Sequence, residues 1–100
     1  SSYRRQIVKA LARRDIVSVN HRIAAFLASV FDIIFAVNRM PHPGEKRLID
    51  IVETRCALRP EGLRQHVTVL LGASALATAS DAAEVLNALD ALVDALELLS

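Results

Sequence analysis

The stretch DIVSVNHRIAAFLASVFDIIFAVNRMPHPGEKRL, residues 15–48, decides the fold. Its apolar residues recur at helical spacing, and Phe31 and Phe35 make its second half apolar on nearly every side. A helix that is apolar all round is enclosed by neighbouring elements. We therefore predict a long central helix over residues 15–40 that packs inside a bundle of other helices.

The length and composition predict one domain, residues 1–100. Hydrophobic residues make up 53% of the chain, which is more than the ~45–50% usual in soluble domains. This excess predicts apolar surface that meets a partner chain or a neighbouring domain. Because the chain starts with Ser1 rather than Met, we expect it to be a piece of a longer protein.

Neither a membrane span nor a signal peptide is predicted. The apolar run from Ile23 to Val37 contains Asp32 and is shorter than the ~20 residues that cross a bilayer. The basic residues near Ser1 are not followed by a signal-peptide pattern. The single Cys56 can form no internal disulfide, which is typical of a reducing compartment. We expect a cytoplasmic protein without a membrane partner.

Helices flank the central one on both sides. Pro41 ends the central helix, and Pro43 suits the first turn of the next one. Residues 72–80 are small and weakly patterned, which predicts a loop or a frayed helix end. The chain shows no strand-like alternation, so the predicted fold class is all-α, a four- to five-helix bundle. The flanking helices are predicted at residues 3–14, 44–57 and 61–72, and the last helix is predicted to be capped by Ser80 or Asp81. Cys56 and Leu71 are expected on the buried faces of the second and third of these flanking helices.

Charge is distributed unevenly along the chain. All twelve Lys and Arg residues lie within residues 1–66, whereas residues 67–100 hold five acids and no base. The simpler interpretation is that the acidic last helix packs beside a basic helix, such as residues 3–14. The alternative is that part of the basic set faces an anionic ligand such as a nucleotide or RNA.

A polar corner follows the predicted central helix. A helix that starts at such a corner offers free N–H groups, which attract anions. The corner is therefore either a phosphate- or carboxylate-binding site or a solvated turn whose polar residues cap helices. His42, which lies between two prolines, is expected to cap or stack. Asp32, beside the buried face, needs a basic partner such as Arg39. The polar residues of the corner are Asn38, Arg39, His42, Glu45, Lys46 and Arg47.

The run FDIIFAVNRMPHPGEKRL, with Arg22 upstream, carries a resemblance. It resembles the helical domain that follows the catalytic domain in bacterial nucleotidyltransferases of the DUF4037-like and kanamycin-nucleotidyltransferase-like groups. In those domains a long apolar helix ends in a pattern like L-N-R-x-x-x-P-x-x-K. The resemblance is best over residues 15–65. The pattern reads here as Val37-Asn38-Arg39, then Pro43 and Lys46.

The resemblance implies that this chain is the C-terminal part of a longer protein. It also implies an accessory role, in which the helical domain closes the cleft and contacts the acceptor or the nucleotide. The catalytic domain, in cis, would carry a Gly-Ser turn and paired aspartates that hold Mg²⁺ and the triphosphate. This chain has no Gly-Ser followed by Asp-x-Asp, so we expect no catalytic residue, metal or cofactor in it and no activity alone. In some relatives a helical-domain carboxylate acts as base, for which Asp32 and Glu45 are candidates. The residues expected to contact substrate are Arg22, Asp32, Asn38, Arg39, Glu45 and Lys46.

Two other functions stay open. The first is a ribonuclease resembling the helical HEPN family, in which an Arg is followed a few residues later by a catalytic His. Arg14 with His21 and Arg59 with His66 have this spacing. The second is a dimerisation or docking module, including a homo-oligomer, which the apolar excess favours. Under the accessory-domain hypothesis we expect no nucleic-acid partner, and no residue pair has the spacing of zinc ligands.

Overall fold

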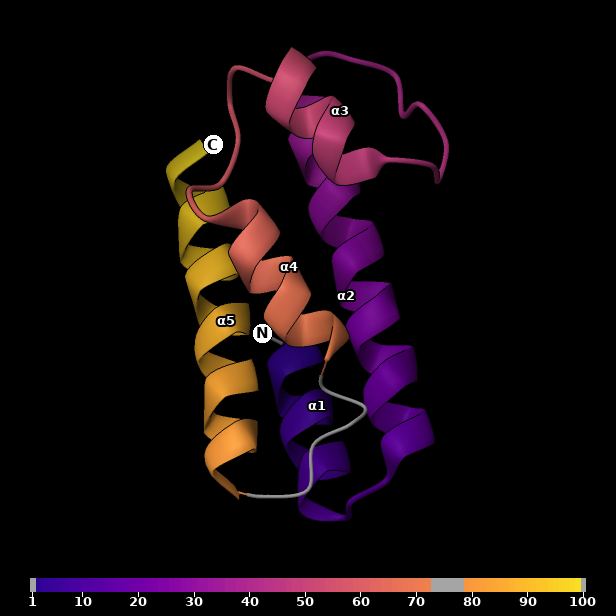
Figure 1. The fold of residues 1–100 in the computed structure, drawn as a ribbon, viewed down its shortest axis with the longest axis vertical. Coiled ribbons are helices and arrows are strands. Elements are labelled where there is room, and N and C mark those ends of the chain that lie inside the picture. The colour runs from indigo at the N-terminus through magenta and orange to yellow at the C-terminus, as the bar shows by residue number, and fades with distance from the viewer. Residues whose placement is uncertain (1, 73–78, 100) are drawn as a thin grey trace.

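The computed structural model describes residues 2–72 and 79–99 (Figure 1). Within these residues it contains five helices and no strand, so the predicted all-α bundle is confirmed. The helices are α1 (Ser2–Ala12), α2 (Ile16–Val37), α3 (Leu48–Arg55), α4 (Leu63–Leu71) and α5 (Ala79–Leu99).

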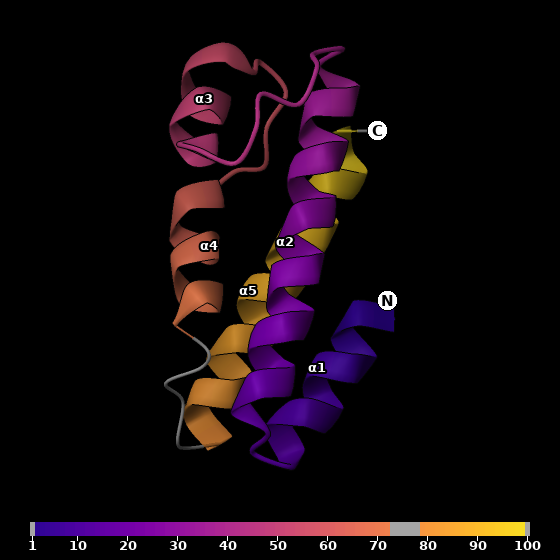
Figure 2. The same cartoon turned by 90° about the vertical axis from the view of Figure 1, so that its right-hand side faces the viewer.

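The two long helices, α2 and α5, run side by side along the bundle (Figures 1 and 2). The shorter α1 and α4 lie on opposite sides of this pair, and each contacts both long helices. α3 sits over the C-terminal end of α2. α2 therefore contacts all four other helices, which makes it the central helix that the sequence predicts.

The buried side of α2 supplies much of the core. Asp15 caps this helix, since its carboxylate accepts a hydrogen bond from the Ser18 N–H at 3.1 Å. Ile16, which the pattern places on the buried stripe, is instead 53% exposed in the first turn of α2. The residues of α2 that are buried are Val19, Ile23, Phe26, Leu27, Val30, Phe31, Ile34 and Phe35.

α5 and α1 bring complementary charges together. The apolar stripe of α5 is buried from Val85 to Leu96, as its spacing predicts. On the outer side of this stripe, the Arg4 guanidinium of α1 contacts the Asp90 carboxylate at 3.0 Å. The predicted pairing of the acidic last helix with a basic first helix is confirmed at this contact. The Tyr3 hydroxyl also lies 2.8 Å from that of Ser29, which joins α1 to α2.

The start of α3 differs from the prediction. Residues 44–47 precede the helix instead of forming its first turn, and α3 begins at Leu48. Gly44 has φ +103° and Arg47 has φ +56°, left-handed values that an α-helix does not accommodate. Pro43 therefore lies in a loop that connects α2 to α3. The central helix likewise ends at Val37 rather than residue 40, because Arg39 also has a left-handed φ of +56°.

The last two helices carry two smaller differences. Leu71, predicted to be buried, is exposed because it is the last residue of α4 and lies about 100° around the helix from buried Leu70. α5 begins at Ala79, so Ser80 and Asp81 lie inside the helix instead of capping it. Of the predicted loop or frayed end at residues 72–80, residues 73–78 lie outside the described residues.

α2 is also long and apolar enough to cross a membrane by length and composition. Its most apolar window has a mean hydropathy of 1.4, and 44% of that window is buried within the bundle. A helix at the centre of a bundle meets the same criterion, because its neighbours cover it as lipid would. The prediction that this helix does not span a membrane stays a prediction.

Candidate functional site

The polar corner, residues 38–47, forms the turn and loop that join α2 to α3 (Figure 1). Residues 41–47 are all exposed. Within the described parts of the chain, no residue forms a hydrogen bond or ion pair with the side chain of Arg39, Lys46 or Arg47. The corner thus presents three cationic side chains to solvent, with Glu45 as its single acid.

Asn38 fixes the base of this corner. Its amide nitrogen donates to the Ile34 and Leu58 carbonyls at 2.7 Å each, and its amide oxygen accepts from the Leu58 N–H at 3.0 Å. Both N–H donors of the amide are therefore in use. Asn38 ties the segment after α3 to the end of α2, which makes it a positioning residue for the predicted site.

His42 fixes the middle of the loop. Its Nδ1 accepts a hydrogen bond from the Gly44 N–H at 3.1 Å, and its ring meets that of Phe35 edge-on, with centroids 5.2 Å apart. The prediction that His42 caps or stacks is confirmed. Since Phe35 belongs to the core, this contact anchors the exposed loop to the rigid part of the bundle.

Asp32 differs from its predicted environment. Its side chain is 72% exposed, and the Nε2 of His42 lies 3.9 Å from its carboxylate. The prediction that Asp32 needs an Arg partner beside a buried face is wrong, because water already solvates this carboxylate. Asp32 and His42 lie together at the edge of the polar corner.

The corner gathers five of the six residues predicted to contact substrate. Asp32 and Asn38 lie near the end of α2, and Arg39, Glu45 and Lys46 follow in the turn and loop. Arg22 lies ten residues before Asp32 on the same helix, which is about 15 Å along the axis at ~1.5 Å per residue. Arg22 is therefore outside the polar corner.

The N-terminus of α3 opens onto the corner. Its cap residue is Arg47, whose side chain makes no capping hydrogen bond. Lys46 and Arg47 precede the helix, whereas the sequence places them one turn inside it. The first N–H groups of a helix carry partial positive charge. Cationic side chains and helix N–H groups therefore converge at one place, an arrangement that attracts phosphates and carboxylates.

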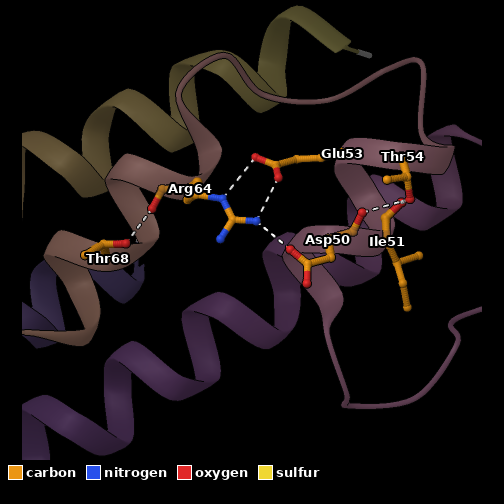
Figure 3. A network of polar contacts seen from close by, with 6 residues as sticks. All are labelled: Asp50, Ile51, Glu53, Thr54, Arg64 and Thr68. Atoms are coloured by element: carbon orange, nitrogen blue, oxygen red, sulfur yellow. Dashed lines mark hydrogen bonds and ion pairs between the residues drawn. The ribbon is translucent and has the colours of Figure 1, made fainter.

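A network between α3 and α4 holds α3 in place (Figure 3). The Arg64 guanidinium of α4 contacts Asp50 at 2.6 Å and Glu53 at 2.8 Å, both on α3. This guanidinium lowers the pKa of Glu53 below its usual 4.5. The sequence analysis missed this pairing, although exposed acids on one helix and a base in the first turn of the next were visible signals.

The Arg64→Gln variant is expected to melt at a lower temperature than the parent chain above pH 4.5. Because Arg64 lowers the pKa of Glu53 from 4.5 in the folded state, this contribution to stability is present above that pH. It is lost as the pH falls through the lowered pKa, so the two melting temperatures should converge. Circular dichroism melts from pH 7 to pH 3 measure this, and a difference that stays constant with pH would contradict it.

The two Arg–His pairs occupy different environments. Arg14 lies in the turn after α1 with φ +55°, and His21 is exposed on α2. Arg59 and His66 both line a groove of about 610 Å³ between α4 and α5, together with Asp94. Arg59 also donates a hydrogen bond to the Cys56 carbonyl at 2.8 Å. The second pair therefore faces a common groove.

The single cysteine has no part in these sites. Cys56 is buried in the core, as predicted, and burial raises the pKa of its thiol. A buried thiol with a raised pKa is a poor nucleophile. Among the described residues, no three His, Cys, Asp or Glu side chains are grouped so that they could hold a metal ion.

No protein-family model, curated protein or solved structure matches this chain. The resemblance to nucleotidyltransferase helical domains therefore rests on the residues at the end of α2 and in the loop that follows. These are the same residues that form the polar corner.

Proposed function

We propose that this chain is the accessory, substrate-side helical domain of a bacterial nucleotidyltransferase. It closes the cleft of the catalytic domain in cis and contacts the nucleotide or the acceptor through the polar corner. One observation carries this proposal. Three cationic side chains, Arg39, Lys46 and Arg47, are exposed and unpaired within the described residues, on a loop that Asn38 and His42 hold in place.

The chemistry of the corner suits an anionic substrate. A guanidinium binds phosphate or carboxylate oxygens through two parallel hydrogen bonds, and an ammonium adds a mobile point charge. Arg39 and Lys46 are the proposed contacts, and Asn38 positions them. Because the loop is already anchored by His42 and Asn38, less conformational entropy is lost when a ligand orders it.

The carboxylates at the corner have a second proposed role. A base that accepts the proton of an acceptor hydroxyl must lie within hydrogen-bond reach of it. Asp32 and Glu45 are exposed at the edge of the corner, where an acceptor bound by the cations would reach them. The Mg²⁺ and the nucleoside triphosphate would be held by the catalytic domain, and the complete enzyme would work in the cytoplasm, where nucleoside triphosphates are abundant.

Replacing Arg39 and Lys46 together by Ala is expected to weaken substrate binding by the complete enzyme about tenfold or more. Each of the two replacements removes a charge-assisted contact with the substrate. Loss of one such contact weakens the affinity by roughly a factor of ten. Calorimetric titrations with a Mg²⁺-bound nucleoside triphosphate and with the acceptor measure the two affinities separately. The melting temperature should stay the same, because both side chains are exposed and unpaired among the described residues.

The matched control replaces Arg5 and Lys9 by Ala. Both are exposed on α1, at the opposite end of the bundle from the polar corner, and the charge change is identical (Figure 2). The control should bind both ligands like the parent enzyme. Unchanged affinity for both ligands in the Arg39/Lys46 variant, or an equal loss in the control, would remove the corner from the substrate site.

The ribonuclease alternative is favoured by one observation, the cavity that Arg59 and His66 share. In that chemistry His66 would move a proton while Arg59 stabilises the charge of the phosphorane. A fluorogenic RNA substrate tests this directly. Cleavage by the chain that His66→Ala abolishes and His21→Ala preserves would replace the accessory-domain proposal; we expect no cleavage by any of the three proteins.

A further inference from the structure

The imidazole ring of His42 has a partner at each of its two nitrogens. Its Nδ1 accepts a hydrogen bond from the Gly44 N–H at 3.1 Å, and its Nε2 lies 3.9 Å from the Asp32 carboxylate. The edge-on contact with Phe35 holds the ring against the core. The side chain is nevertheless 36% exposed, so water can deliver a proton to it. The ring therefore links the loop after α2 to that helix and remains accessible to solvent.

The two contacts determine which protonation state the ring has in this structure. A backbone N–H can only donate, so Nδ1 of His42 carries a lone pair and no proton. A neutral imidazole then holds its single proton on Nε2, the nitrogen that faces Asp32. The arrangement around the ring is therefore that of neutral histidine.

Protonation of the ring affects its two partners in opposite ways. In the imidazolium both nitrogens are donors. The proton on Nε2 still faces Asp32, and the new positive charge is attracted by that carboxylate. The proton on Nδ1 would point at the N–H of Gly44, where two donors meet. The hydrogen bond to Gly44 must therefore break when the ring becomes charged.

The backbone can change conformation at Gly44 once this bond is lost. Gly44 has φ +103°, a value that glycine adopts readily and other residues do not. Among the described residues, no atom lies within 4 Å of the position that a Cβ of Gly44 would take, so open space surrounds it. Pro41 and Pro43, on either side of His42, have φ angles fixed by their rings. The freedom gained is therefore concentrated in residues 44–47.

The charge of this corner changes between pH 5 and pH 8 through His42. Histidine is the side chain that ordinarily changes charge in that range, whereas carboxylates, lysine and arginine ordinarily titrate outside it. On α2, the charged group that faces the ring is Asp32. Within the described parts of the chain, no charged side chain of the loop forms an ion pair with the ring. The charged residues of the loop are Arg39, Glu45, Lys46 and Arg47.

We propose that His42 is a pH-sensitive switch for the conformation of the polar corner. The neutral ring binds Gly44 and holds residues 44–47 in the conformation described above. The imidazolium releases Gly44 and stays beside Asp32, and the segment then leaves that conformation. Because Lys46 lies in this segment, protonation changes its position relative to the end of α2. The switch concerns the conformation of the loop and operates whether or not the corner binds a nucleotide.

Nuclear magnetic resonance of the ¹⁵N-labelled chain tests the switch directly. At pH 8 the ring spectrum of His42 should show the proton on Nε2. From pH 8 to pH 5 the Gly44 amide proton should move upfield, as its hydrogen bond is lost, along the same curve as the His42 ring. His21, exposed on α2, is the internal control, since its ring should titrate without its curve appearing at Gly44. The amides in the core of α2 should stay in place.

Three variants separate the parts of the switch. In His42→Asn the Oδ1 of Asn accepts from the amide two residues on and does not titrate, so the Gly44 amide should keep its pH 8 position. His42→Phe keeps a ring beside Phe35 without an acceptor, so this amide should keep its pH 5 position. Asp32→Asn removes the carboxylate that favours the imidazolium, so the midpoint of the transition should move to lower pH.

Several results would each overturn the proposal. In the parent chain these are a proton on Nδ1 of His42 at pH 8, a Gly44 amide that does not follow the ring, and core amides of α2 that move along the same curve. In the variants they are a Gly44 amide that still titrates in His42→Asn or His42→Phe, and a midpoint that does not fall in Asp32→Asn.

Discussion

Replacing Phe35 by Ala is expected to lower the free energy of unfolding by about 3–5 kcal/mol, the usual cost of deleting a buried aromatic ring. Phe35 is 1% exposed and is the largest of the completely buried side chains among the described residues. Its ring also holds the His42 ring of the polar corner. Since a domain of this size has a stability of roughly 5–15 kcal/mol, the variant should lose a large part of it.

Urea unfolding followed by circular dichroism measures this loss, with Val17→Ala as the control. Val17 lies on the same helix but is 80% exposed, so its replacement should change the stability by no more than ~0.5 kcal/mol. A Phe35→Ala variant as stable as the control would show that α2 does not pack in the centre of the bundle. In that case the arrangement of the other helices around it would also be wrong.

Asn38→Ala is expected to cost about 1–3 kcal/mol and to loosen the segment around Leu58. The substitution removes three hydrogen bonds and leaves the Leu58 N–H without its acceptor. Hydrogen exchange of the Leu58 amide reports this locally, since its protection should be lost in the variant while that of the amides in the core of α2 remains.

Asn20→Ala is the control for Asn38→Ala, because it makes the same chemical change at a residue that is exposed on α2. It should leave both the stability and the exchange of Leu58 unchanged. If Asn38→Ala behaved like this control, Asn38 would be available for a ligand. The proposed role of Asn38 would then change from a positioning residue to a residue that contacts the substrate directly.

The elements that the sequence predicts well are those whose spacing repeats over several turns. The stripe of α2 through Val19, Ile23, Phe26 and Val30 and that of α5 through Val85 and Leu96 are both buried. In each helix, apolar residues recur at helical spacing over several turns, so they form one continuous face that must be buried. The pairing of α1 with α5 was also predictable, because one is basic and the other acidic.

The polar corner was less predictable because its geometry depends on single backbone angles. Arg39 and Arg47 adopt a left-handed conformation that is uncommon for residues other than Gly. Residues 44–47 have the composition of a helix start, and only these angles exclude them from α3. The sequence therefore identified the charges of the corner but placed Lys46 on a helix instead of a loop.

Contacts between distant segments were also invisible in the sequence. The bonds between Asn38 and Leu58 join positions twenty residues apart, and Arg64 reaches across to Asp50 from the next helix. The exposure of Asp32 depends on how α2 is rotated within the bundle, which no local pattern determines. These three features arise from tertiary packing, so local periodicity in the sequence does not predict them.

The central claim is that the polar corner belongs to the accessory domain of a nucleotidyltransferase, and the most direct test is the source gene upstream of the codon for Ser1. We predict a continuous reading frame that encodes a catalytic domain with a Gly-Ser turn followed by Asp-x-Asp. A start codon within a few residues of Ser1 would contradict the account, because this chain would then have no catalytic domain in cis to serve.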